Sequence, residues 1–399
     1  MDANRWRRRQ RQLGALVALL VLSLLLGGTA LAGKPEKKPK PDPDPDPPAL
    51  SGTIYLAEGN ELHATWPFAS ATSLYGLDLD GAGTPVDLQR PGGFVSHAEH
   101  GGSPWVLHGV ETSGSHPDGF KKMELHATNI ATGSTVALLT QSDFDAAATT
   151  EFEITYDAWV AWWPGDTSIA LTLVVWDLSS TPATIQESGI YVADVSWDTA
   201  TGTPSLDPSS WALLAAVPAH DSSQLSWQMG QLGIPTTALM FNGGAKFYVD
   251  PDGELLLYDD KWELPPKILD LLTSSSTPFS PSCAPNPAPG PWSPDGTSIV
   301  FIHDFHVYLT DAAQYSCDLL ADSGDKRNNF AGFYVPLVWS PQGTHVAVRH
   351  RVVERDYVTH RNYVIDVATG TDTSLTPDAG CDYVDESDLL FLHPIAWRP

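Results

Sequence analysis

Basic side chains are scarce in this sequence: 22 Lys and Arg stand against 48 Asp and Glu, so the formal net charge at pH 7 is −26. Nucleic acid and anionic lipid repel a chain of this charge, which argues against a nucleic-acid partner. Cysteine is scarce as well. Cys283, Cys317 and Cys381 form no C-x-x-C pair, which argues against a zinc ribbon or a thioredoxin-like site. In an oxidising compartment two of the three can form a disulfide, but the spacing does not select the pair.

Short enzyme motifs are missing too. The sequence has no P-loop, dinucleotide fingerprint, H-E-x-x-H pair or G-x-S-x-G nucleophile elbow. Helical periodicity is almost absent after residue 50. Short runs rich in Val, Ile, Tyr, Trp and Thr alternate there with clusters of Gly, Pro, Asp and Ser, and this pattern indicates an all-β fold.

The first 32 residues have the three parts of a secretory signal peptide. Arginines at positions 5, 7, 8, 9 and 11 precede an uninterrupted apolar run from Leu13 to Leu26, and Ala30-Leu31-Ala32 offers a cleavage site. We therefore expect a periplasmic or secreted protein. The apolar run is near the lower limit for crossing a bilayer, so an uncleaved membrane anchor is the alternative.

Residues 33–50, GKPEKKPKPDPDPDPPAL, follow as a Pro-rich charged tether. Alternating Pro and Asp cannot build helix or sheet ladders and favours extended polyproline II. We expect this segment to be a spacer that holds the domain at 51–399 away from a membrane or wall.

One ten-residue unit recurs along the rest of the chain. WSPDGTSIVF at 292–301 returns as WSPQGTHVAV at 339–348, with a degraded copy at 162–172 and a truncated one at 395–399. The S-P-D-G segment suits a type I turn, because Pro stands second and Gly fourth. The Trp before the turn ends one strand, and the apolar run after it forms the next.

Each unit predicts a small antiparallel meander, because a further strand follows in several copies, as in NYVIDVATG at 362–370. One meander cannot bury both of its faces. The copies must therefore stack, and radial stacking gives a β-propeller. We expect Trp163, Trp292, Trp339 and Trp397 to fill the wedges between neighbouring sheets, since this position calls for aromatic bulk.

The W-S-P-D-G-x-x-I-x-F pattern, followed by a Tyr/Val-rich strand that ends in D-x-x-x-G, resembles the repeat of the TolB-like, WD-repeat-like propellers. The resemblance covers residues 51–399 and implies a TolB-like β-propeller there. TolB itself carries an α/β domain before its propeller, where this sequence has only the tether. The family's lipoprotein-partner role is therefore not carried over.

Aligning the strand after each turn gives six copies, which begin near Gly52, Gly102, Thr167, Thr236, Thr297 and Thr344. The sequence therefore predicts a six-bladed β-propeller. Seven blades are the alternative, because the copies near 167 and 236 are long and degenerate. GTIYLAE at 52–58 resembles a second strand and HPIAWRP at 393–399 a first strand. We expect these two end strands to pair and close the ring, which leaves only short, protected edges.

One position, at the end of the second strand, carries a polar side chain in five of the six copies. It holds Glu58, His108, Leu173, Asn242, His303 and His350. By analogy with WD-repeat propellers it lies near a loop that rims one mouth of the channel. Imidazole and carboxylate suit Zn or Mn, so Glu58, His108, His303 and His350 are candidate metal ligands, and Asn242 and His306 are candidate ligand-binding rim residues. The alternative is that the histidines are hydrogen-bonded structural residues.

Some TolB-like propellers, such as the oligogalacturonate lyases, hold a metal with histidines in the channel, and the resemblance here is of residue type only. Calcium is a further candidate, because LDLDGAG at 77–83 and DPDG at 250–253 contain closely spaced acids. Both segments lack the Asp spacing and terminal Glu of an EF-hand, so they favour plain turns.

Two functions compete. The leading hypothesis is an exported, monomeric binding or scaffolding module whose partner is an envelope protein or an extracellular glycan. The alternative is a metal-dependent polysaccharide lyase or hydrolase that works in the channel through His108, His303 or His350. The fold does not decide between them, because propellers host many unrelated functions.

Overall fold

A computed structural model shows how the predicted strands are arranged. It describes residues 50–59, 73–80, 84–95, 105–115, 121–144, 149–154, 159–181, 183–207, 210–217, 247–258, 266–284, 287–304, 306–322, 329–330, 337–354, 357–375, 379–382 and 391–399. No helix within these ranges is long and apolar enough to cross a membrane. The predicted signal peptide and residues 33–49 of the tether lie outside them.

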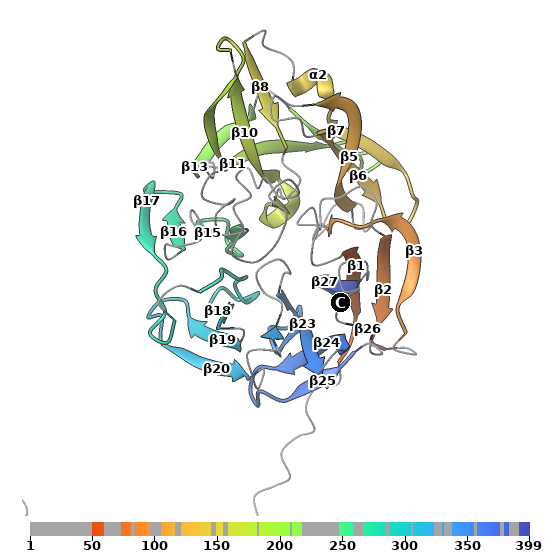
Figure 1. The fold of residues 1–399 in the computed structure, drawn as a ribbon, viewed down its shortest axis with the longest axis vertical. Helices are drawn as coiled ribbons and strands as arrows, with labels where there is room; N and C mark the ends of the chain where they lie inside the picture. The colour runs from red at the N-terminus through yellow and green to blue at the C-terminus, as the bar shows by residue number, and fades with distance from the viewer. Residues whose placement is uncertain are drawn as a thin grey trace, which may run out of the picture. The chain divides into compact units, whose positions relative to one another are not determined.

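The described strands form six small antiparallel sheets around an axis (Figure 1), which confirms the predicted six-bladed β-propeller. Blade 1 contains β27 (Phe391–Arg398), β1 (Thr53–Gly59), β2 (Ser73–Asp78) and β3 (Val86–Pro91). Blade 2 contains β4 (Phe94–Val95), β5 (Trp105–Ser115), β6 (Lys121–Asn129) and β7 (Thr135–Leu139). Blade 3 contains β8 (Thr150–Glu153), β9 (Val160–Trp162), β10 (Ser168–Asp177), β11 (Thr184–Trp197), β12 (Pro204–Leu206) and β13 (Ala212–Ala216).

Blade 4 contains β14 (Phe247–Val249), β15 (Leu255–Tyr258), β16 (Lys267–Asp270) and β17 (Ser275–Pro278). Blade 5 contains β18 (Ser298–His303), β19 (His306–Asp311) and β20 (Cys317–Ala321). Blade 6 contains β21 (Asn329–Phe330), β22 (Val338–Trp339), β23 (His345–Glu354), β24 (Tyr357–Asp366), β25 (Asp372–Ser374) and β26 (Ala379–Asp382). Two short helices, α2 (Gln141–Phe144) and η1 (Pro164–Asp166), complete the described elements. Strands β3, β17, β20 and β25 lie on the outer side of the ring.

The two end strands close the ring as predicted. Strand β27 pairs antiparallel with β1 from Thr53↔Arg398 to Gly59↔Phe391, and β2 pairs with the other edge of β1. The indole Nε1 of Trp397 donates a hydrogen bond to the carbonyl oxygen of Ser51 at 3.0 Å. Blade 1 is therefore built from both ends of the propeller region.

Cross-strand pairing fixes the register of the repeat. The Trp near the end of each first-strand segment, Trp292, Trp339 or Trp397, lies opposite Ile299, Val346 or Ile54 of the second strand. In blade 3 the residue at this position is Trp162, which pairs with Ile169. The prediction for Trp163 is thus one residue out of register, because Trp163 already begins the turn. Trp163 still packs between blades, against the cluster that joins blades 3 and 4.

The fourth copy was placed wrongly by the sequence alignment. Its second strand is β15, which begins at Leu255, whereas the alignment put it near Thr236. Asp250 to Gly253, interpreted above as a plain turn, is the repeat's own turn. The Oδ1 atom of Asp250 accepts hydrogen bonds from the amides of Glu254 and Leu255 at 2.8 and 2.7 Å. Ser340 plays the same part in blade 6, where its Oγ accepts from the amides at the start of β23.

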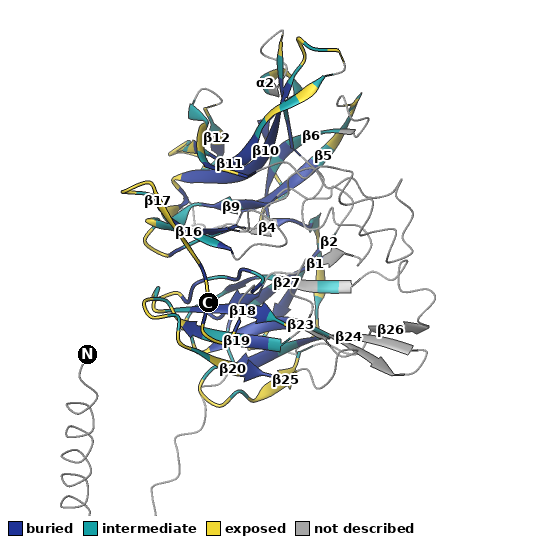
Figure 2. Cartoon of the chain, turned by 60° about the vertical axis from the view of Figure 1, so that its left-hand side comes forward, coloured by how far each residue is buried: buried dark blue, intermediate teal, exposed yellow. Residues whose placement is uncertain are grey.

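Apolar clusters of the described residues seal the six interfaces between blades. They join Leu74 to Val106, Leu107 to Ile169, Ala170 to Leu256, Leu257 to Ile299, Val300 to Val346 and Ala347 to Ile54. Successive residues of one second strand thus face opposite neighbours, as the two-residue period of a strand requires. Burial is concentrated in the inner strands, while β17 and β25 are exposed (Figure 2).

Blade 5 departs from the pattern at its first strand. Prolines at 287, 289 and 291 interrupt that segment, and proline has no N–H to donate to a ladder. Only isolated bridges, Ala288↔Ile302 and Trp292↔Ile299, connect it to β18. Gly290 permits the close approach between them, since a Cβ there would lie 1.9 Å from the carbonyl oxygen of Val300.

A disulfide between Cys283 and Cys317 joins the proline-rich insert of blade 5 to the start of β20. Their Cα atoms are 6.0 Å apart, and the amide of Ser282 donates to the carbonyl oxygen of Tyr315 at 3.0 Å. The sequence left this pairing open. Cys381, in β26, is the cysteine left over.

We expect Trp397→Ala to lower the free energy of unfolding by about 3–5 kcal/mol, because it empties a buried site at the ring closure. Trp397 is 6% exposed. Trp397→Phe is the matched control: it keeps most of the packing and loses the bond to Ser51, at about 1 kcal/mol. Urea denaturation measures both. Small and equal losses would show that the closing strand is not coupled to the ring.

Thiol titration tests the disulfide directly. Denatured but unreduced protein should show one reactive thiol per chain, and reduced protein three. Replacing Cys283 and Cys317 together with Ser should lower the free energy of unfolding by about 4 kcal/mol, since the bond closes a loop over a sequence separation of 34. Cys381→Ser is the control and should keep the disulfide. Three titratable thiols in exported, unreduced protein would contradict the pairing.

Candidate functional site

The hairpin between β18 and β19 brings two of the predicted site residues together. His303 and His306 are cross-strand neighbours at its tip. The Nε2 atom of His303 lies 3.6 Å from the Oδ2 of Asp304, and the Nδ1 of His306 lies 3.0 Å from the Oδ1 of Asp322. Blade 5 thus presents two imidazole–carboxylate pairs at one end of its inner hairpin.

His350 lies within β23 opposite Arg361 of β24, and its ring centroid is 5.6 Å from that of Tyr363. Burial lowers the pKa of His350 to about 4, with Asp372 acting against the shift and Arg361 adding to it. The imidazole is therefore neutral at physiological pH, the form that can bind a metal.

His108 does not occupy the same register as these residues. It lies two residues after Val106, the second-strand residue that pairs with the end of the first strand. His303 and His350 lie four residues after the equivalent residues of their own blades, Ile299 and Val346. The position equivalent to His108 is occupied in the other five blades by buried residues, namely Leu56, Leu171, Tyr258, Phe301 and Val348. His108 is therefore a core residue of the interface between blades 1 and 2, and its prediction as a rim residue is corrected.

Polar neighbours accommodate His108 in this interface. It is 4% exposed, and its Nε2 lies 3.0 Å from the Oγ1 of Thr128. The ring of His126, directly across from it in β6, is 5.9 Å away and pairs with Glu124 at 3.0 Å. Burial, and to a smaller extent the charge of His126, lower the pKa of His108 to about 4.

The three predicted histidine ligands that the structure describes do not converge. Among the described side chains, no group of three or more His, Cys, Asp or Glu is placed to hold a metal ion. His303 and His306 come together, but His108, His303 and His350 do not meet at one point. The side chain of Glu58 and the whole of Asn242 lie outside the described residues, so a metal site that uses them stays a prediction.

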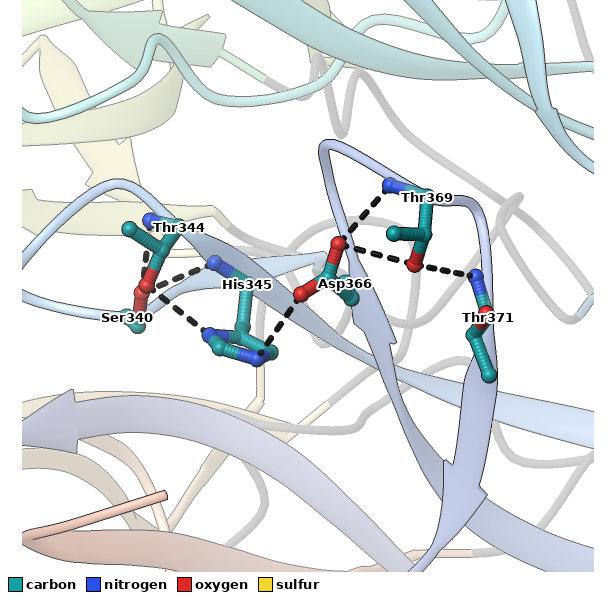
Figure 3. Close-up of polar contacts among 6 residues, drawn as sticks. All are labelled: Ser340, Thr344, His345, Asp366, Thr369 and Thr371. Carbon is teal, nitrogen blue, oxygen red and sulfur yellow. Dashed lines mark hydrogen bonds and ion pairs between the residues drawn. The ribbon is translucent and has the colours of Figure 1, made fainter. Parts of the chain in front are cut away.

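A polar network that the sequence did not predict joins the turn of blade 6 to the end of β24 (Figure 3). The Oγ1 of Thr344 lies 2.8 Å from the Nδ1 of His345, whose Nε2 lies 3.6 Å from the Oδ2 of Asp366. The Oδ1 of Asp366 accepts hydrogen bonds from the amide and hydroxyl of Thr369 at 2.8 and 2.9 Å. Burial acts to raise the pKa of Asp366, but these bonds lower it overall.

This network has the hydroxyl–imidazole–carboxylate order of a nucleophile triad. The contact between His345 and Asp366 is longer than a hydrogen bond. His345 is 7% exposed, and its ring lies 6.3 Å from that of Trp397 in the closing strand. In the equivalent pair of blade 3, Ser168 donates a hydrogen bond across the strands to Asp194 at 3.3 Å. The network therefore fastens the turn of blade 6 to its own β24 and to blade 1.

A cleft of about 540 Å³ lies between blades 5 and 6. One wall is residues 318–322, most of β20 and the residue after it, and the other is the hairpin between β24 and β25. Asp318, Asp322 and Asp372 line it and are exposed, and Leu309 and Val367, both half-buried, line it as well. Sequence reasoning missed this site because its walls are about fifty residues apart in the chain.

No family model and no curated protein sequence matches the chain. Among solved structures, a 6-phosphogluconolactonase-like protein from Bacteroides fragilis is 10% identical, with 88% of this chain and 99% of that chain covered and a TM-score of 0.41. A quinoprotein alcohol dehydrogenase-like protein from Bacteroides thetaiotaomicron is 11% identical, with 84% and 76% covered and a TM-score of 0.41. An oligogalacturonate lyase in complex with manganese is 13% identical, with 82% and 74% covered and a TM-score of 0.34.

These likenesses are too distant to carry an activity across to this chain. The chain's own strand order and register define its class, a six-bladed β-propeller. Membership of the TolB-like family stays a prediction from the repeat.

His108 should make stability depend on pH. The unfolded chain takes up the imidazole proton near pH 6.5 and the folded chain only near pH 4. The stability that neutral His108 supplies is therefore full above pH 6.5 and is lost as the pH falls to about 4. A pKa difference of this size corresponds to about 3 kcal/mol.

His108→Leu places in blade 2 the residue that blades 1 and 3 have at this register. We expect the variant to lose less free energy of unfolding than wild type between pH 7.5 and pH 4.5, measured by urea denaturation. His350 contributes in the same window, so part of the dependence remains. An unchanged pH dependence in His108→Leu would show that folding does not lower the pKa of His108.

Proposed function

We propose that this propeller is an exported binding module of the TolB-like kind, and that its partner is an envelope protein. The observation that carries the proposal is the preformed cleft between blades 5 and 6. Its volume, about 540 Å³, is in the range of roughly 300–1,000 Å³ that is usual for ligand sites. It lies between sheets that are fixed by buried apolar clusters, so binding there requires little ordering of the protein.

Two features support export. The first 32 residues have the pattern of a signal peptide, and the proline-rich segment after it suits a spacer. The Cys283–Cys317 disulfide is of a kind that persists in the periplasm or outside the cell. We place the protein in one of these compartments, with the tether between the signal segment and the ring.

Co-sedimentation with isolated envelopes tests the proposal. Purified, labelled full-length protein should bind envelopes of the producing organism saturably, and an excess of unlabelled protein should compete. Treating the envelopes with protease should abolish the binding, because the partner is a protein. Envelopes treated with glycan hydrolases are the control and should keep it.

Two results would contradict the binding module. The first is the absence of saturable binding. The second is chelator-sensitive turnover of a polysaccharide panel that is lost in His303→Ala and His350→Ala, which would favour the metal-dependent lyase or hydrolase. Binding that survives protease but not glycan hydrolases would replace the protein partner with a glycan.

A further inference from the structure

The cleft between blades 5 and 6 combines an apolar floor with an acidic rim. Leu309 of β19 and Val367, directly after β24, form its floor, because both are half-buried and pack against the apolar cluster that joins the two blades, and Gly370 lines it from blade 6. The hairpin comes so near to β20 that a Cβ on Gly370 would lie 2.7 Å from the carbonyl oxygen of Leu320. The floor is thus formed by direct contact between the two blades, which fixes the spacing of its walls.

Three carboxylates surround this floor. Asp318 and Asp322 come from blade 5 and Asp372 from blade 6. His306 lies 3.0 Å from Asp322 and holds that side chain at the mouth, where it is 61% exposed. No Lys or Arg is among the described residues that line the cleft.

We propose that this cleft receives a lysine- or arginine-rich segment of the partner polypeptide. Such a side chain has two parts, an apolar stem and a cationic head. The stem fits the floor at Leu309 and Val367, and the head fits the three carboxylates of the rim. The net charge of −26 adds a long-range attraction that speeds the encounter of the two proteins. This inference rests on the proposed binding function and names the chemistry of its partner.

The arrangement of the side chains in the cleft also bears on whether its occupant is a metal ion or a peptide. A compact metal ion would need its ligands gathered around one point, and the described carboxylates and imidazoles form no such group. The cleft is instead lined by five successive residues, 318–322, and by a hairpin turn, an arrangement that can meet successive side chains of an extended segment. The proposed occupant is therefore a peptide segment.

The test measures binding of a fluorescein-labelled octalysine peptide to the full-length protein by fluorescence anisotropy. We expect one peptide per chain and an affinity that weakens as salt is raised, because exposed charges are screened within about 10 Å at 0.1 M salt. The triple variant Asp318→Asn, Asp322→Asn, Asp372→Asn should weaken binding at least about tenfold, or about 1.4 kcal/mol. An octalysine with acetylated side chains should not bind.

A matched variant separates the cleft from net charge. Asp87→Asn, Asp252→Asn and Glu254→Gln remove the same number of charges from exposed positions of blades 1 and 4 outside the cleft. This control should keep the affinity within about twofold. An equal loss in both triple variants would overturn the proposal, because binding would then follow total charge alone. No binding of octalysine to wild type would overturn it too.

A second variant tests the cleft with all three carboxylates in place. Ala368→Lys puts an ammonium group on the lip of the cleft, at an exposed position of the hairpin. It should weaken octalysine binding as the cleft triple does, while thermal melting shows that both variants are folded. Wild-type affinity in Ala368→Lys would overturn the proposal.

The envelope assay separates a failure of the cleft proposal from a failure of the proposed binding function. If the cleft triple loses both octalysine and envelope binding, the partner uses the cleft. If it loses octalysine but still binds envelopes saturably, the partner docks elsewhere, so the cleft proposal fails and the binding module stands. If wild type binds octalysine but not envelopes, the proposed function fails. Spermine binding that matches octalysine, with the same loss in the cleft triple, would replace the peptide with a small polycation.

Discussion

Pairing between β1 and β27 is the interaction on which the rest of this ring depends. A single blade has two faces to cover, and each second strand here sends alternate side chains to the blade before and the blade after it. Such a stack has no stable end, since the outermost face would be left in water. Pairing β27 with β1 puts Ile54 against Ala347 and removes both ends at once.

The repeat made most of this fold predictable. The two close copies at 292 and 339 predicted a Trp, a turn and a strand in the correct register. The fourth copy was missed because Val249 stands in the place of Trp and Asp250 in the place of Ser. A carboxylate accepts the same amide hydrogen bonds as a hydroxyl, so the turn keeps its hydrogen bonds although its residues differ from those of the other copies.

The candidate site was less predictable, for two physical reasons. His108 was assigned to the rim because the second copy has no recognisable turn, and an error of two residues keeps a side chain on the same face but moves it along the strand. The acidic cleft depends on how closely two blades approach. That distance is set where Gly370 meets Leu320, a contact between residues far apart in sequence.

Ring closure also determines how the domain resists a mechanical pull. Leu50 leads directly into β1, which is paired along one edge with β2 and along the other with β27. Hydrogen bonds in antiparallel pairs run perpendicular to the strands. Tension transmitted along the chain at Leu50 therefore shears both ladders together and does not open them one bond at a time. Unfolding under force would be slow for this reason, whatever the equilibrium stability of the ring.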